Sequence, residues 1–229
     1  MSFADRFGKI KQFTLQSVGK AEKTEESGDF LELVDGMKKT KTELTTLLDA
    51  AKKYHRRETE ANESFEALSG AFAKVTSSEA PARASLLAYV PMISKSAVAK
   101  TEMLNVFKVN IIDVINNILE MQQKQAEKAY KNLEAARLDM DAKQRSFRST
   151  LENTKKSTQE DIDKAKIKAD DAETEYNRCK EVCIETFNEL EKVKLDFIRT
   201  KLSAFANAMG HYGASSAGEA ATFIDENPV

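Results

Sequence analysis

The sequence has 229 residues, of which 31% are charged and 41% hydrophobic, and its net charge is -2. It contains only 8 Gly, 3 Pro and no Trp, too few turn-forming residues for a sandwich, a barrel or a doubly wound sheet. The near-neutral charge provides no global basic field for nucleic acid or membrane, so an electrostatic function would need local clusters. Without a signal peptide or a run of 18 apolar residues, the sequence is expected to form a soluble, intracellular, all-α chain.

The first long helix is expected over about residues 28–76. Ser27 precedes it as a candidate cap, and apolar residues then recur at three- and four-residue steps along the whole tract. The following segment, residues 77–91, contains Pro81 and Pro91. It is expected to hold a turn with either a short helix or a kink, and the sequence leaves these two alternatives open.

The second and third helices are expected over about residues 92–153 and 158–210. Thr158 begins a Thr-Gln-Glu-Asp sequence that resembles a capping box, and Gly210 and Gly213 are expected to end the third helix. Helices of roughly 60 and 50 residues are about 90 and 75 Å long. Because such helices must lie along equally long partners, we predict a long three-helix antiparallel coiled-coil bundle.

Large apolar residues crowd the first half of the second helix and form a face broader than a coiled-coil seam. Such a face suits a helix that packs within its own chain and also against a second chain. We therefore expect a homodimer through this end, with slender arms projecting outward. The residues expected at the dimer interface are Val106, Phe107, Ile111, Ile115 and Ile118.

Residues 1–24, called the leader below, do not continue any of these apolar stripes. They carry five basic and two acidic residues, a local charge of +3, and wound as a helix they place aromatic side chains on one face. A short, basic amphipathic helix with Phe is typical of segments that insert into an anionic membrane interface. The alternative is a fourth helix docked on the bundle. The leader residues expected to contact membrane are Phe3, Phe7, Ile10, Lys9 and Lys11.

A second basic cluster surrounds the expected turn between the second and third helices. Residues 143–168 carry eight basic and four acidic side chains, a local charge of +4, which leaves -9 for the chain outside the cluster and the leader. A solvated helix tip would also be basic, but the segregation of charge favours a binding role. The basic residues of the cluster are Lys143, Arg145, Arg148, Lys155, Lys156, Lys164, Lys166 and Lys168.

Three stretches carry a resemblance to a known family. Residues 19–24, Gly-Lys-Ala-Glu-Lys-Thr, resemble the leader-to-helix junction of amphiphysin-type proteins, and residues 130–141 resemble that family's arginine-leucine-aspartate-x-aspartate element. Residues 172–212 resemble its last helix. The chain therefore resembles an N-BAR domain protein of the BAR superfamily, similar to amphiphysins and endophilins.

The resemblance implies a crescent-shaped homodimer whose concave face binds curved anionic membrane, with phosphatidylserine or phosphoinositides as ligands. It implies residues 1–24 as a membrane-inserting segment, residues 25–229 as the BAR domain, and a cytoplasmic, peripheral membrane protein of membrane trafficking and endocytosis that senses or generates curvature. No SH3 domain follows in this sequence, so no SH3-mediated partner is expected. By position, Lys164, Lys166 and Lys168 match concave-face residues, Lys155 and Lys156 match the tip, and Arg137, Lys143 and Arg145 are assigned to the concave side.

Other functional classes find little support. Cys179 and Cys183 lie on an apolar stripe with no His or further Cys nearby, which favours core packing over a metal site. The basic stretch around His55 is interpreted as a solvated helix face, not a nucleic-acid site. No catalytic motif is present, so neither enzymatic activity nor a cofactor is expected. The rival hypothesis is a structural coiled-coil scaffold or tether that does not bind lipid directly.

Overall fold

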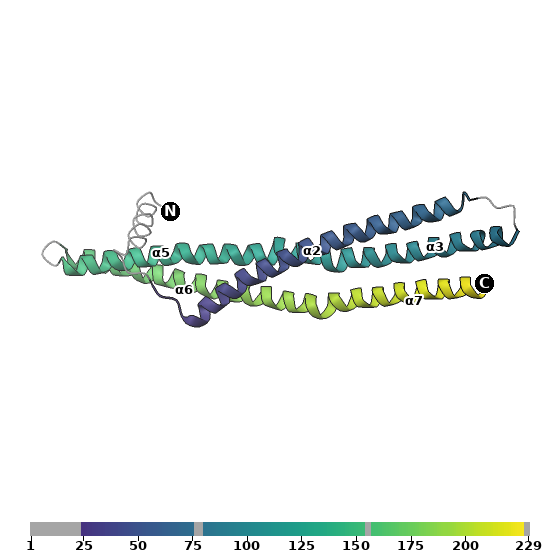
Figure 1. Ribbon diagram of the computed structural model, residues 1–229. Helices are drawn as coiled ribbons and strands as arrows, with labels where there is room; N and C mark the ends of the chain where they lie inside the picture. The colour runs from purple at the N-terminus through teal and green to yellow at the C-terminus, as the bar shows by residue number, and fades with distance from the viewer. Residues whose placement is uncertain (1–23, 76–79, 154–156, 227–229) are drawn as a thin grey trace. The chain divides into compact units, whose positions relative to one another are not determined.

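The computed structural model describes residues 24–75, 80–153 and 157–226, and within these ranges the chain is all-α (Figure 1). Three long helical tracts confirm the expected fold class. The first tract is α2 (Gly28–Phe72). The second comprises α3 (Ala80–Phe107), η1 (Lys108–Ile112), α4 (Asp113–Ile118), η2 (Leu119–Gln123) and α5 (Lys124–Glu152), and the third comprises α6 (Gln159–Asp196), η3 (Phe197–Lys201) and α7 (Leu202–Glu226).

The second tract begins earlier than expected. Helix α3 starts at Ala80, not near residue 92, and it runs through Pro91 without a break. Proline has no N–H to donate to the carbonyl four residues earlier, here that of Leu87. The Leu87 side chain is 67% exposed, so this region of α3 faces water, which can satisfy the orphaned carbonyl. Residues 77–91 were expected to hold a turn with either a short helix or a kink, and from Ala80 onward the structure has helix there, continuous with the second tract.

The third tract does not end where expected, because α7 continues through Gly210 and Gly213 to Glu226. Each glycine in a helix interior costs about 1 kcal/mol relative to alanine. Tertiary contacts of α7 with α3 offset this cost. The Phe223 ring packs edge-on against Tyr89 with centroids 5.5 Å apart. Lys95 also forms a 3.0 Å ion pair with Glu219, but the Lys95 side chain is largely exposed, so the pair adds little to the packing.

Within the described ranges, three π-helical turns interrupt the α-helical hydrogen bonding: η1 and η2 in the second tract, and η3 in the third. In a π turn the N–H bonds to the carbonyl five residues earlier, so the turn holds an extra residue. The sequence contains no Gly or Pro at these positions, and its apolar periodicity did not indicate them. The turns keep Ile111, Ile112 and Phe197 buried.

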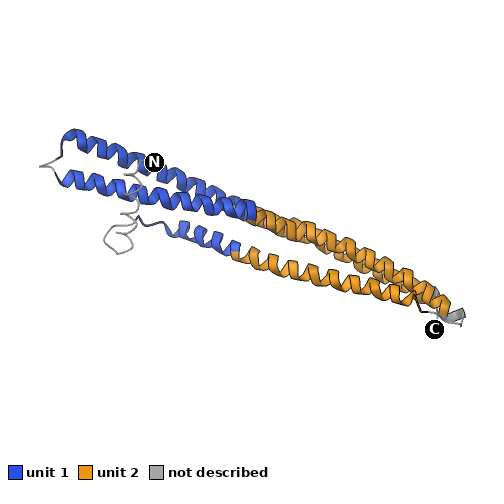
Figure 2. Ribbon diagram, turned by 90° about the horizontal axis from the view of Figure 1, so that it is seen from above, with its two compact units in different colours: residues 1–41, 120–192 blue, residues 42–119, 193–229 orange. Residues whose placement is uncertain are grey.

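The chain divides into two compact units (Figure 2). Unit 1 comprises residues 1–41 and 120–192, and its described part includes residues 24–27, the start of α2, most of η2, α5 and most of α6. Its core includes five buried alanines, three on α5 and two on α6. The larger core side chains are Phe30, Val34, Met37, Leu133, Met140, Tyr176, Phe187 and Leu190.

Unit 2 comprises residues 42–119 and 193–229, and it contains the rest of α2, α3 through α4, η3 and α7. Its core is built from larger side chains. The Phe107 ring lies at its centre and contacts the rings of Tyr54 and Phe205 at centroid distances of 5.1 and 4.6 Å. Asn62 extends into this core, where its amide donates 3.0 Å hydrogen bonds to the Ala97 carbonyl and the Thr101 hydroxyl.

Candidate membrane-binding surface

The start of α6 has the capping box that its sequence predicts. The Thr158 hydroxyl accepts a hydrogen bond from the backbone N–H of Asp161 at 3.2 Å, and the Asp161 carboxylate accepts one from the Thr158 backbone N–H at 3.0 Å. The hydrogen bond from the Thr158 hydroxyl lowers the pKa of Asp161. Because the cap fixes the first turn of α6, it also fixes where the lysines that follow lie.

The three expected lysines of α6 are exposed, but they do not share one face. At 100° per residue, Lys164 and Lys168 lie about 40° apart, whereas Lys166 lies about 200° from Lys164. All three side chains reach solvent, and Lys164 also pairs with Glu160 one turn earlier. The helix therefore offers a pair of lysines on one side and a single lysine on another.

The basic residues of α5 are divided in the same way. Arg145 and Arg148 are three residues apart and lie on one side of the helix, and Lys143 lies on another. Arg148 is exposed, and Lys143 and Arg145 are half-buried. One terminal nitrogen of the Arg145 guanidinium is buried without a hydrogen-bond partner. Lys155, Lys156 and the leader residues Phe3, Phe7, Ile10, Lys9 and Lys11 lie outside the described residues.

Arg137 does not belong to this surface, so its expected assignment to the concave side is corrected. Its side chain is 5% exposed, and its guanidinium binds the Asp141 carboxylate at 3.2 Å and the Glu134 carboxylate at 3.0 Å. A cation with two carboxylate partners inside the protein is not available to a lipid headgroup. Arg137 is instead part of the polar interior of unit 1.

The expected dimer-interface residues lie mostly in the core of unit 2. Phe107, Ile111, Ile115 and Ile118 are buried within the single chain, and Val106 is half-buried. They pack against their own chain and leave almost no surface for a partner. A second chain at this segment would therefore meet the exposed neighbours of these residues.

An ion pair at the surface of α6 shows the contrast with the Arg137 cluster. The Arg178 guanidinium donates two 2.7 Å hydrogen bonds to Glu175, and these lower the pKa of Glu175 to about 2. The side chains of both residues are more than half exposed, at 62% and 53%. Water and salt screen such a pair, so it contributes little to stability despite its good geometry.

Three polar residues that the sequence analysis did not single out are brought together in unit 1. Thr24 and Glu26 precede α2, and they bond to side chains of α5 and α6 that are more than 100 positions away in the sequence. Asp141 on α5 is the partner of Thr24. No periodic pattern reports a contact at this separation, so only the structure reveals the cluster.

The two cysteines lie in the core of unit 1, as predicted, and both are free thiols. Burial raises the pKa of the Cys183 thiol to about 12, and burial also raises that of Cys179. Since the thiolate is the reactive form, we expect neither thiol to react with 5,5′-dithiobis(2-nitrobenzoate) at pH 8 until the protein is unfolded in guanidinium. Two thiols released rapidly from the folded protein would contradict this packing.

The described residues contain neither a helix long and apolar enough to cross a bilayer nor a group of acidic, His and Cys side chains placed to hold a metal ion. Their exposed side chains include the cations near the α5–α6 turn and a group of large apolar residues, most of them on unit 2. Long helices with exposed cations and exposed apolar side chains are typical of helical modules that bind a second protein chain or a charged surface.

Comparisons with known proteins identify the module. The chain matches the BAR domain family over residues 3–219, and it belongs to that family. BAR domains are membrane-curvature-related, non-catalytic modules that typically dimerise and associate peripherally with membranes.

Two solved structures are similar in fold. A BAR protein from Galdieria sulphuraria aligns with a TM-score of 0.65 and 14% identity, covering 88% of this chain and 98% of that one. The N-terminal I-BAR domain of D. discoideum IBARa aligns with a TM-score of 0.53 and 15% identity, covering 87% and 89% of the two chains. No curated protein sequence matches the chain.

Proposed function

We propose that this BAR domain acts as a homodimer that binds anionic membranes and senses or generates their curvature, in membrane trafficking such as endocytosis. The observation that carries the proposal is the basic cluster around the α5–α6 turn, whose described cations include the exposed Arg148, Lys164, Lys166 and Lys168. Each basic residue near an anionic bilayer contributes roughly 1 kcal/mol. This contribution falls off within a Debye length of about 8 Å, so the cations act only where the surface comes close.

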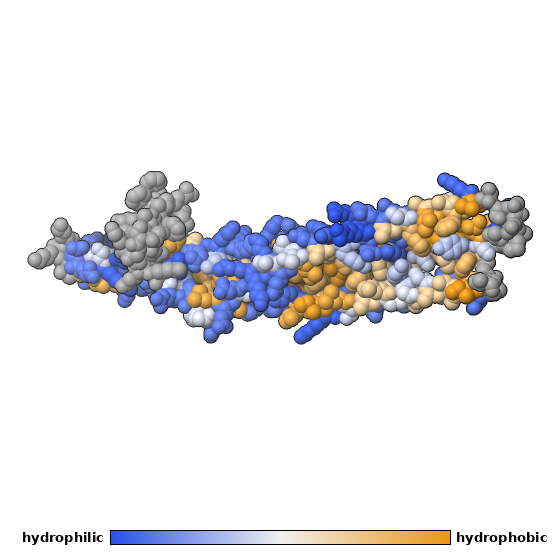
Figure 3. Space-filling model, in the orientation of Figure 1, coloured by the Kyte–Doolittle hydropathy of each residue, from blue (hydrophilic) through white to orange (hydrophobic). Residues whose placement is uncertain are grey.

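Unit 2 supports dimerisation. Of the 18 large hydrophobic side chains exposed among the described residues, 13 belong to unit 2. On the face shown in Figure 3, hydrophobic residues gather over parts of α3 and α7. Covering such a surface with a second copy removes apolar area from water and doubles the number of membrane-binding cations. Among the side chains that a partner would cover are Val98, Val109, Ile198, Leu202 and Met209.

The proposed mechanism combines two contributions. In a rigid, crescent-shaped dimer, the cations of both arms reach headgroups together only on a bilayer of matching curvature. The leader supplies the second contribution. Its Phe3, Phe7 and Ile10 would enter the acyl boundary of one leaflet and favour bending. Phosphatidylserine and phosphoinositides are the proposed ligands because both bring negative charge to the surface.

Electron microscopy of phosphatidylserine-containing liposomes mixed with the protein tests the proposal. We expect coated tubules, together with co-sedimentation that weakens as salt is raised. Substituting Phe3→Ser, Phe7→Ser and Ile10→Ser should abolish tubules and leave salt-sensitive binding, because the cations remain. As a control in the same segment, Gln12→Ser with Gln16→Ser should tubulate normally.

Two results would refute the proposal. Liposomes that stay spherical and do not bind the protein would favour a scaffold or tether without direct lipid contact. A stable monomer in sedimentation at micromolar concentration would remove the dimer on which the crescent depends. Binding without tubules would narrow the function to curvature sensing.

A further inference from the structure

Thr24, the last residue of the leader, and residues 25–27 lead into α2 and are called the connector below. The side chains of Thr24 and Glu26 bond to α5 and α6. The Thr24 hydroxyl donates a 2.5 Å hydrogen bond to Oδ1 of Asp141, and the Thr24 backbone N–H lies 3.5 Å from Oδ2. Asp141 is itself held by Arg137 at 3.2 Å. The partner of Thr24 is therefore a carboxylate that has a fixed position inside unit 1.

Glu26 fastens the connector to α6. Its Oε1 accepts a 2.5 Å hydrogen bond from the Tyr176 hydroxyl, and its Oε2 accepts a 2.6 Å bond from the Lys180 ammonium. The Glu26 side chain is only 8% exposed. The Lys180 ammonium also lies 5.0 Å from the centroid of the Phe30 ring, the first buried side chain of α2. Charge-assisted bonds that are shielded from water are among the stronger polar contacts of a protein.

The connector ends at Ser27, which caps the start of α2. The Ser27 hydroxyl accepts a hydrogen bond from the backbone N–H of Phe30 at 3.4 Å, and the Phe30 ring stacks on Phe187 of α6. From Thr24 to Phe30, the backbone is thus held by α5, then by α6, then by its own helix. A linker that only joined two elements would need none of these contacts.

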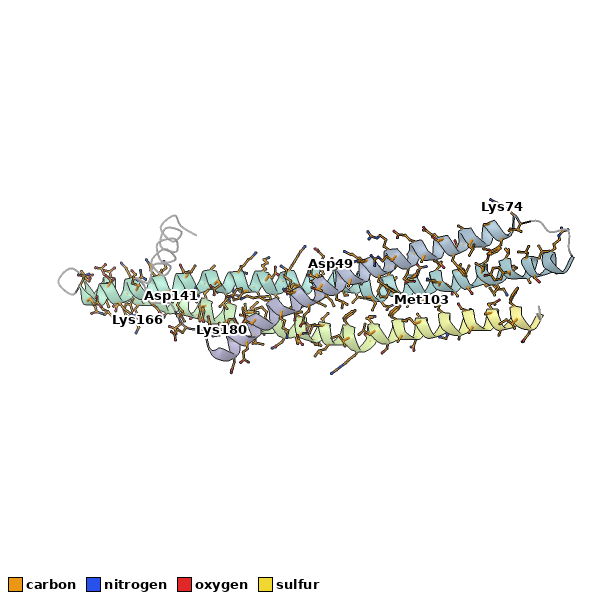
Figure 4. The ribbon with its side chains drawn as sticks, in the orientation of Figure 1. Asp49, Lys74, Met103, Asp141, Lys166 and Lys180 are labelled. Atoms are coloured by element: carbon orange, nitrogen blue, oxygen red, sulfur yellow. The ribbon has the colours of Figure 1, made fainter. Side chains whose placement is uncertain are left out.

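Thr24 bonds to α5 on the side of the helix that also carries Arg145 and Arg148. Asp141, Arg145 and Arg148 are spaced i, i+4 and i+7, so they form one stripe along the helix. Along the axis, Arg145 and Arg148 lie about 6 and 10 Å beyond Asp141, toward the α5–α6 turn. Figure 4 shows Asp141, Lys180 and the exposed Lys166 within the same part of unit 1. The end of the leader is therefore fixed one to two helical turns from the basic cluster.

We propose that the connector is a positioning device, in which Thr24 and Glu26 fix the base of the leader beside Arg145 and Arg148 so that the leader and these cations meet the same patch of membrane. The inference rests on the proposed membrane function. Because the connector is already ordered before binding, no conformational entropy is lost there when the leader inserts. Without the bonds from Thr24 to Asp141 and from Glu26 to Tyr176 and Lys180, the connector would have to become ordered during insertion.

A double-mutant cycle in the full chain tests this role. The connector variant carries Thr24→Val, which keeps the Arg137–Asp141 pair intact, and Glu26→Gln. The leader variant carries Phe3→Ser, Phe7→Ser and Ile10→Ser. Affinity for vesicles of phosphatidylserine and phosphatidylcholine is measured for the unchanged protein, each variant and their combination. Glu25→Gln is the matched control, since Glu25 is exposed and loses the same charge one position away.

We expect the connector substitutions to weaken binding about tenfold when the leader is intact and less than twofold when the leader is already disabled. Glu25→Gln should change neither value. Equal losses with and without a functional leader would overturn the proposal, since the connector would then serve only the bundle. Absence of vesicle binding by the unchanged protein would instead refute the proposed function, which separates the two failures.

Hydrogen exchange provides a second readout. In the connector variant, amides of residues 24–30 should exchange faster, and those of α5 and α6 should keep their protection. If the connector variant unfolds unit 1, the single substitution Thr24→Val takes its place in the cycle. This substitution removes one hydroxyl and leaves the Arg137–Asp141 and Lys180–Glu26 pairs intact. Its smaller loss of affinity should again disappear when the leader is disabled, and a loss that persists would count against the positioning role.

Discussion

Charge reversal of the three α6 lysines, Lys164→Glu, Lys166→Glu and Lys168→Glu, is expected to weaken binding to anionic vesicles by at least 100-fold. Three cations near the surface contribute about 3 kcal/mol, and a factor of ten in affinity corresponds to about 1.4 kcal/mol. Replacing them by anions adds repulsion to this loss. The affinity is measured by co-sedimentation at physiological salt, where the remaining binding should depend less steeply on ionic strength.

A matched control exists on unit 2. Lys53→Glu, Arg56→Glu and Arg57→Glu make the same change of charge on exposed side chains of α2, which the sequence analysis interprets as a solvated face. Binding of this variant should stay within a few-fold of the unchanged protein. If both triple variants lose affinity equally, attraction is governed by net charge and not by the α5–α6 end.

The division of the lysines between two sides of α6 refines the experiment. Lys164→Glu with Lys168→Glu changes one side, and Lys166→Glu changes the other. The substitutions on the side that faces lipid should cause the larger loss of vesicle affinity for each charge reversed. Equal losses per charge would indicate that both sides come within a Debye length of the bilayer.

Substitution of Arg137 by Met is expected to destabilise the protein by about 3–5 kcal/mol. Arg137 is the buried partner of Asp141, whose side chain is 5% exposed. Met fills similar space but leaves the carboxylate buried without its cation. The loss is measured by urea unfolding at fixed protein concentration, because the stability of the proposed dimer would vary with concentration.

Arg178→Met provides the control, since Arg178 forms the same type of pair with a glutamate three residues earlier on an exposed face. Its loss should be about 0–1 kcal/mol. Adding Asp141→Leu to Arg137→Met should recover most of the lost stability, because two apolar side chains replace an orphaned charge. Because Asp141→Leu also removes the acceptor of the Thr24 hydroxyl, Thr24→Val is added to the comparison, and a large loss that persists there would show that Arg137 acts through contacts other than its charge.

The three long helices could be predicted from the sequence because each tract repeats apolar residues at helical spacing over many turns. The ends were less predictable. Glycine is common just past the end of a helix, yet Gly210 and Gly213 lie inside α7, where contacts such as that between Tyr89 and Phe223 hold the tract to α3. Local propensity is a weak guide wherever packing between helices decides.

The candidate site was predictable in outline and not in detail. The basic cluster could be located by counting charged residues along the sequence, which requires no coordinates. Such counting could not distinguish Arg137, buried between carboxylates, from Arg148, which reaches solvent. The choice of dimer-interface residues met the same difficulty, because Ile115 and Ile118 are buried in the core of their own chain. A stripe of apolar residues does not say which partner covers it.

The connector illustrates a different limit. Thr24 and Glu26 have partners on α5 and α6 that are 117, 150 and 154 positions away. Such pairs are set by how three helices align side by side. An Asp, a Thr and a Glu in isolation look like ordinary surface residues, so their role becomes visible only when the helices are placed together.

The π-helical turns have a consequence for how the length of this chain can vary. A π turn holds about one residue more than an α-helical turn, and the helices on either side keep their phase. Loss of one residue within η1, η2 or η3 would therefore return that turn to α-helix without rotating the flanking segments. The same deletion elsewhere in a tract would turn everything beyond it by about 100° and carry buried side chains to the surface. Within the described residues, these three short segments are thus positions where the loss of one residue would preserve the phase of the flanking helices.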